Sequence, residues 1–67
     1  MVYDITEPWD LDVIGDYLIN NNVSYSVRAG VQNGFNVATY RADIVNEDAS
    51  FLLLKYPSVL FNKVNIE

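Results

Sequence analysis

The sequence predicts an α+β fold in which two helices pack on one face of a small antiparallel sheet, in the order βαββαβ. Two observations support it: an Asn33-Gly34 pair separates two runs of alternating apolar residues, and a segment with helical features lies on each side of that hairpin. Apolar stretches at both ends supply the first and last strands. We expect a compact split βαβ, or ferredoxin-like, arrangement, with αββαβ as the alternative if the first strand does not form.

The chain length allows a single domain, residues 1–67, with a thin core. A chain of 67 residues buries roughly 60% of the surface that it exposes when unfolded. Hydrophobic residues make up 51% of the sequence, which is too many for a disordered segment. This excess predicts that part of the apolar surface is covered by a partner or by a second copy.

The first third of the chain is expected to form a strand and a helix. Val2 to Thr6 alternates weakly and precedes Pro8, as in a short strand. The helix is expected from about residue 9 or 11 to residue 20, with Asp10 as its N-cap. Its predicted apolar row consists of Leu11, Ile14 and Leu18.

Residues 23–44 are predicted to form a β-hairpin. Asn33-Gly34 suits a type I′ turn, in which both central residues have positive φ. This turn pairs Gln32 with Phe35 and collects the apolar residues of both strands on one face. We expect that face to be buried; it consists of Val23, Tyr25, Val27, Ala29, Val31, Ala38, Tyr40, Ala42 and Ile44.

A second helix and a last strand are expected after the hairpin. Asn46 or Asp48 is the expected cap of a helix that ends near Lys55, before Pro57. The run from Phe51 to Leu54 is apolar on every side, so a buried strand is the alternative for this segment. The last strand is expected from Val59 to Ile66.

The net charge of −5 lies entirely in the N-terminal third. Residues 1–22 contain five acidic and no basic residues, whereas residues 23–67 contain four of each. A surface of one sign attracts partners of the opposite sign, although a solvated acidic face that keeps the protein soluble is the simpler interpretation. The sequence has no apolar run of the ~18 to 20 residues that a membrane span needs and no signal-peptide pattern. We therefore expect a cytoplasmic protein without membrane contact.

The residue types present argue against an enzyme. The chain has neither His nor Cys, so it lacks the commonest general base and the usual transition-metal ligands. Its three glycines are too far apart to form a phosphate-binding loop. Asp10, Asp12 and Asp16 do not follow a calcium-loop pattern. We expect no catalytic residue, metal or cofactor.

These features favour a small acidic protein-binding module. It would dock on a larger protein with a basic surface as an inhibitor or decoy, in the style of phage and mobile-element antagonists of nucleic-acid-handling or defence proteins. Trp9 is either a binding hot spot or an apolar lid over the core. The expected partner-binding residues, with an acidic face made by the four carboxylates, are Asp4, Glu7, Trp9, Asp12 and Asp16.

Two other functions are compatible with the sequence. The first is a self-associating structural subunit, a homo-oligomer that buries an edge strand or the open sheet face. The second is a nucleotide or nucleic-acid binder that uses Arg28, Phe35 and Arg41 on the outer face of the hairpin. The negative net charge argues against nucleic acid, because phosphate binding normally needs a basic excess.

Overall fold

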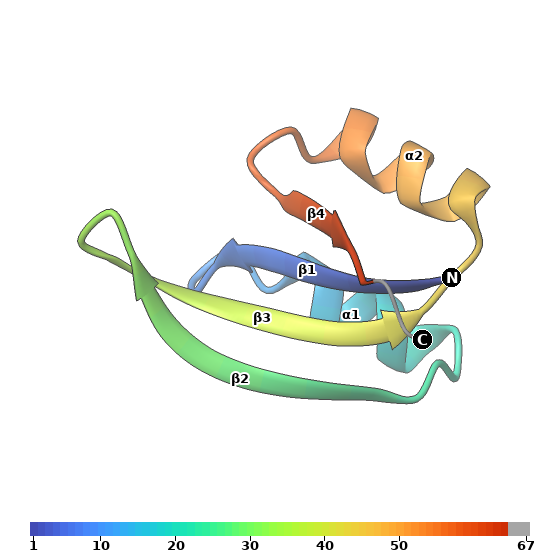
Figure 1. Cartoon of the computed structure of the whole chain (residues 1–67), viewed down its shortest axis with the longest axis horizontal. Coiled ribbons are helices and arrows are strands. Elements are labelled where there is room, and N and C mark those ends of the chain that lie inside the picture. The colour runs from blue at the N-terminus through green and yellow to red at the C-terminus, as the bar shows by residue number, and fades with distance from the viewer. Residues whose placement is uncertain (65–67) are drawn as a thin grey trace.

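The computed structural model describes residues 1–64 and confirms the α+β fold with the order βαββαβ (Figure 1). Its elements are β1 (Val2–Pro8), α1 (Val13–Asn20), β2 (Tyr25–Gln32), β3 (Phe35–Asp43), α2 (Asn46–Lys55) and β4 (Leu60–Lys63). The four strands form one sheet in the order β2-β3-β1-β4, and all neighbouring strands are antiparallel. This is the predicted split βαβ arrangement, with β1 between β3 and β4.

The hairpin has the predicted turn and register. Asn33 and Gly34 have φ angles of 53° and 80°, as a type I′ turn requires. Gln32 pairs with Phe35, and Val27 pairs with Tyr40. Turn chemistry and hydrophobic pattern therefore agree on one alignment of the two strands.

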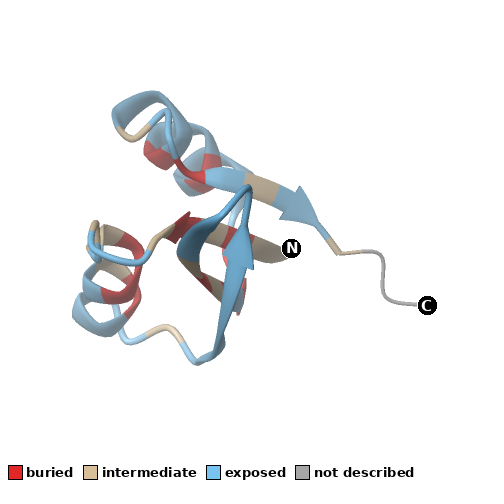
Figure 2. Ribbon diagram, turned by 90° about the vertical axis from the view of Figure 1, so that its left-hand side faces the viewer, coloured by how far each residue is buried: buried red, intermediate tan, exposed pale blue. Residues whose placement is uncertain are grey.

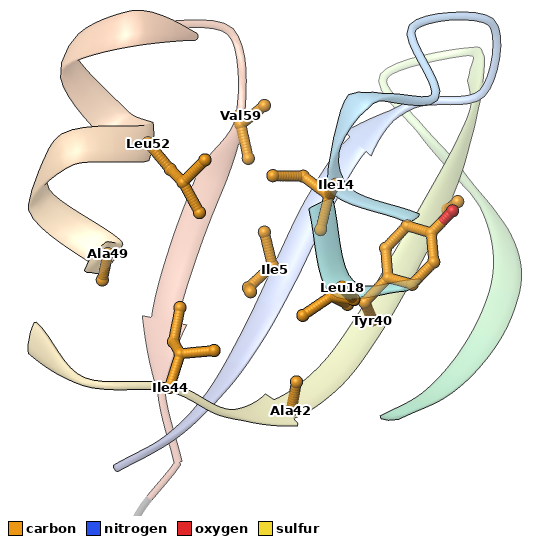
Figure 3. Close-up of a cluster of buried hydrophobic side chains, with 10 residues drawn as sticks. Ile5, Ile14, Leu18, Tyr40, Ala42, Ile44, Ala49, Leu52 and Val59 are labelled. Carbon is orange, nitrogen blue, oxygen red and sulfur yellow. The ribbon is translucent and has the colours of Figure 1, made fainter. Parts of the chain in front are cut away.

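Both helices lie on one side of the sheet (Figure 2). The core between the helices and the sheet centres on Ile5 of β1, which is completely buried. Around it, α1 contributes Ile14 and Leu18, and α2 contributes Ala49 and Leu52 (Figure 3). The remaining core residues are Ala38, Tyr40, Ala42, Ile44 and Val59. The core therefore lies over the central strands β1 and β3.

The prediction of a buried inner hairpin face is wrong for its β2 half. All eight residues of β2 are exposed, whereas Ala38, Tyr40 and Ala42 of β3 are buried. Tyr25, expected in the core, is 38% exposed and contacts the edge of the Tyr40 ring with ring centroids 5.6 Å apart. An eight-residue helix such as α1 is only about 12 Å long, and the two short helices pack over β1 and β3, so β2 stays uncovered.

Both helix starts differ from the prediction. α1 begins at Val13, and the residue before it is Asp12, which has a left-handed φ of 53° and makes no side-chain cap. The expected Asp10 cap is therefore wrong. α2 covers Asn46–Lys55 with Val45 in the N-cap position, so capping by Asn46 or Asp48 is also wrong, as is the strand alternative for residues 51–54.

The last strand is shorter than expected. β4 spans Leu60–Lys63 and, among residues 1–64, pairs only with β1. Ile66, the expected end of this strand, lies outside the described residues.

Candidate functional site

A groove of about 660 Å³ lies near the hairpin turn, and its apolar floor belongs to the open face of the sheet. Because side chains alternate along a strand, residues next to the buried Ile5, Glu7 and Ala38 point away from the helices. Pro8 and Val37 are cross-strand neighbours on this open face. The principal apolar lining residues are Pro8, Trp9, Phe35, Val37 and Leu60.

Trp9 is the largest side chain in this groove and is 58% exposed. Its backbone is nevertheless fixed, because its N–H donates a hydrogen bond of 3.1 Å to the carbonyl of Asn36 and extends the β1–β3 ladder by one residue. Phe35 and Leu60, which line the same groove, are 74% and 49% exposed. The interpretation of Trp9 as a lid over the core is therefore wrong.

Leu60 and Val37 were not among the residues expected at a site. The pairing of Pro8 with Val37 and of Thr6 with Leu60 places them beside Trp9. The sequence pattern does not reveal these pairings, because each joins residues at least 29 positions apart. Phe35, expected on the alternative ligand face, lies in the same groove as Trp9.

The five residues expected to bind a partner are not all brought together. Asp12 and Asp16 are exposed at the start of α1, shortly after Trp9. Asp10, which lies between them and Trp9, is exposed and lines the groove. Asp4 is paired with arginines on the open sheet face, and Glu7, although part of the groove lining, is only 1% exposed. The predicted acidic face with four carboxylates is therefore wrong.

Asp4 lies on the open sheet face between two arginines. The Arg41 guanidinium binds its carboxylate in bidentate fashion, with Nε–Oδ1 and Nη2–Oδ2 distances of 2.8 Å and 3.0 Å. Arg28 Nη2 lies 3.8 Å from Asp4 Oδ2. The hydrogen bonds from Arg41, with the nearby Arg28 charge, lower the pKa of Asp4, and the same pair raises the pKa of Arg41. Asp4 therefore adds no free negative charge to a docking surface.

The alternative ligand face does not converge either. Phe35 and Arg41 are six residues apart on β3, which corresponds to roughly 20 Å along a strand. Arg28 and Arg41 both face Asp4, whereas Phe35 belongs to the Trp9 groove. A single nucleotide that stacks on Phe35 would not reach the Arg41 end of the strand.

Glu7 is buried, with 1% of its surface exposed. Its Oε1 accepts hydrogen bonds from the backbone N–H groups of Val13 and Ile14, at 3.0 Å and 3.1 Å. These N–H groups at the start of a helix otherwise lack partners and carry partial positive charge. Glu7 thus caps α1 from the end of β1, and its expected position on the surface is wrong.

The hydroxyl of Tyr40 lies in the same buried region. Burial and the carboxylates of Glu7 and Asp12 raise the pKa of Tyr40 to about 12. Within residues 1–64, the second oxygen of Glu7, Oε2, is buried and accepts no hydrogen bond. This polar cluster stabilises the start of α1 and is closed to a partner.

The exposed carboxylates gather on the helix side of the molecule. Asp12 and Asp16 belong to the start of α1, and Glu47 and Asp48 to the first turn of α2. Burial and the nearby Asp48 carboxylate raise the pKa of Tyr17 in α1. The helix side is therefore acidic, while Arg28 and Arg41 lie on the opposite face.

Other kinds of site were sought in the same residues. In the described part of the chain, no group of three or more metal-binding side chains could hold an ion. No helix within residues 1–64 is long and apolar enough to cross a membrane. Comparisons with protein-family models, curated proteins and solved structures found no match to this chain.

Proposed function

We propose that this chain is a small acidic protein-binding module that docks on a basic surface of a larger cytoplasmic protein and acts there as an inhibitor or decoy. The observation that carries the proposal is Trp9, which is 58% exposed on a fixed backbone. Tryptophan is enriched at binding hot spots, where a large apolar side chain enters a pocket of the partner. An exposed indole beside an apolar groove suits such an anchor.

The charges around Trp9 define the partner. Asp10, Asp12 and Asp16 follow it directly and are exposed, and residues 9–22 contain no Lys or Arg. Carboxylates at the rim of an apolar contact attract a positively charged surface and increase the association rate. The partner is therefore a protein with a basic patch next to an apolar pocket.

A nucleic-acid-handling or defence protein has the required chemistry, because surfaces that hold phosphates are rich in Lys and Arg. A module that occupies such a surface blocks its substrate, which is how phage and mobile-element antagonists act. Binding of nucleic acid by this chain itself is disfavoured, because Asp4 forms ion pairs with Arg28 and Arg41, the arginines that would contact phosphates. The proposal assigns no catalytic role to any residue.

The test is capture of a partner by the tagged protein from a candidate host lysate, followed by titration of the purified pair. Trp9→Ala is expected to weaken binding at least tenfold, and so is the triple variant Asp10→Asn, Asp12→Asn, Asp16→Asn. The charge variant should also reduce the salt dependence of binding. The matched controls are Phe51→Ala, an aromatic residue on α2 that is 59% exposed, and Glu47→Gln. Full affinity in both Trp9-side variants would refute the proposal.

A further inference from the structure

β2 is an outer strand of the sheet that is open along its whole length. It pairs with β3 on one side and with no other strand among residues 1–64. All eight of its residues are exposed (Figure 2). An edge of this kind is a template for pairing with another strand.

The hydrogen bonds of β3 identify which β2 groups point outward. Trp9 donates to the carbonyl of Asn36, and Ile44 donates to the carbonyl of Met1, so even-numbered residues of β3 face β1. The odd-numbered residues then face β2, where their partners are Ser26, Arg28, Gly30 and Gln32. Since hydrogen-bonded pairs alternate along an antiparallel ladder, the outward N–H and C=O groups belong to Tyr25, Val27, Ala29 and Val31.

The β2 edge lacks most of the features that normally prevent strand pairing. Its sequence, YSVRAGVQ, contains no Pro and no Lys, and its pairing with β3 runs without interruption from residue 25 to residue 32. The opposite edge, β4, has only four residues and ends in Lys63. Natural sheets protect edges with short strands, charges, Pro and bulges. β4 is both short and charged, whereas β2 is eight residues long and has Arg28 as its one charge, so β4 is the better protected edge.

The side chains of β2 match the exposed backbone. Tyr25, Val27 and Val31 point to the helix side but are 38%, 53% and 71% exposed, because the helices do not reach them. In an added strand, each would acquire a neighbour about 4.5 to 5.5 Å away on the same face. The edge thus offers both backbone groups and an apolar row.

The charges of the chain favour a second copy as the occupant. β2 contains no carboxylate, and its one charged residue, Arg28, lies near Asp4. Five exposed carboxylates lie at residues 10–16 and 47–48. Two copies can therefore pair along β2 without bringing carboxylates together. A basic partner, in contrast, would be attracted to the carboxylates on the helix side.

We propose that β2 pairs antiparallel with β2 of a second copy about a two-fold axis and forms a continuous eight-stranded sheet. A two-fold axis makes the interface self-complementary. Arg28 directly opposite Arg28 of the second copy is unfavourable, so the axis passes at Val27 or Ala29. Residues 25–31 do not line the Trp9 groove, so this dimer is independent of the proposed function.

The first test measures molecular mass against concentration by light scattering. The wild-type chain is expected to reach twice its monomer mass. Ala29→Pro removes an outward N–H and should give a monomer with an unchanged circular dichroism spectrum. Val27→Lys with Val31→Lys places four lysines at the interface and should have the same effect, which covers the case in which the proline variant does not fold. Phe51→Lys and Leu54→Lys on α2 are controls that should stay dimeric.

The second test is amide hydrogen exchange of the wild-type chain. The N–H groups of Tyr25, Val27, Ala29 and Val31 should become protected as concentration rises, at the concentrations where the mass doubles. A wild-type chain that remains monomeric at millimolar concentration would overturn the proposal. This holds even if β2 instead pairs with a strand of another protein. A dimer that persists in folded Ala29→Pro and in the double-lysine variant, or that is lost in the α2 controls, would also overturn it.

Discussion

Glu7, near the end of β1, caps helix α1 through a hydrogen bond of 3.1 Å from the backbone N–H of Ile14 to its Oε1 atom. A second bond of 3.0 Å comes from Val13. Asp12, in the N-cap position, makes no side-chain cap, so Glu7 takes over that role. The strand and the helix are therefore joined by a buried polar contact as well as by apolar packing.

The first prediction concerns Glu7→Ala. It should lower the free energy of unfolding by about 2 to 3 kcal/mol, because the buried N–H group of Ile14 and the part-buried N–H group of Val13 lose a charged acceptor. Glu7→Gln should cause a smaller loss, since its amide oxygen still accepts these bonds without the favourable charge at the helix N-terminus. Urea unfolding followed by circular dichroism measures both values.

The control for this prediction is Glu47→Ala in the first turn of α2, where the side chain is exposed. Its expected loss is below about 1 kcal/mol, from the helix dipole alone. A loss of less than about 1 kcal/mol in Glu7→Ala, no larger than that in Glu47→Ala, would show that the buried cap adds nothing beyond the helix dipole.

The hairpin could be predicted from sequence because its information is local. The Asn33-Gly34 turn fixes the pairing of its own flanking residues, and the period-2 pattern selects the same register. The order of elements follows in the same way, from short segments read one at a time. The pattern did not show how far the helices extend over the sheet, and therefore Tyr25 and Val27 were wrongly expected in the core.

The site depended on contacts between distant positions. Asp4 and Arg41 are 37 residues apart and meet only because β1 pairs with β3. A carboxylate such as Glu7 is expected on the surface by default, and its burial depends on the orientation of α1. The sequence identified Trp9 as a candidate, but only the structure shows that it is exposed beside Phe35 and Leu60.

The second prediction couples Gly15 to Tyr40. A Cβ atom on Gly15 would lie 2.8 Å from the Tyr40 hydroxyl oxygen, which is too close for an unstrained contact. Tyr40 is 8% exposed, so it has little room to move. Gly15→Ala should destabilise the fold by about 1 to 3 kcal/mol, although alanine favours a helix by about 1 kcal/mol over glycine.

The test of this coupling is a double-mutant cycle with Tyr40→Phe, which removes the hydroxyl oxygen. In the Tyr40→Phe background, Gly15→Ala should be neutral or stabilising, and the difference between the two backgrounds measures the contact. If Gly15→Ala lowers stability equally in the wild-type and Tyr40→Phe backgrounds, the strain does not arise from contact with the hydroxyl group.

The third prediction is a loss of stability at alkaline pH that depends on Tyr40. Its pKa is raised from 10.0 to about 12 in the folded protein, so the folded state keeps a proton that the unfolded state releases. The contribution of Tyr40 to stability is therefore constant below pH 10 and is lost as pH rises toward 12. Two pH units correspond to about 2 to 3 kcal/mol. The measurement is the free energy of unfolding of the wild type and of Tyr40→Phe at pH 8 and at pH 11.5. The variant should lose less stability than the wild type between these two pH values. Equal losses would contradict the assignment to Tyr40.

The fourth prediction concerns the acid side of the stability profile. Arg41 lowers the pKa of Asp4 below its ordinary value of 3.8, so the folded state favours the ionised carboxylate. This stabilisation is complete above the unfolded pKa and is lost as pH falls through the lower, folded value. The wild type should therefore be more stable than Asp4→Asn at pH 6, and the difference should shrink toward zero near pH 2.

Arg41→Gln should remove the same pH-dependent stabilisation, and the double variant should add little to either single change because both act on one ion pair. Thermal unfolding at pH 6, 4, 3 and 2 gives these differences. A gap between the wild type and Asp4→Asn that stays constant from pH 6 to pH 2 would mean that the ion pair does not determine acid stability.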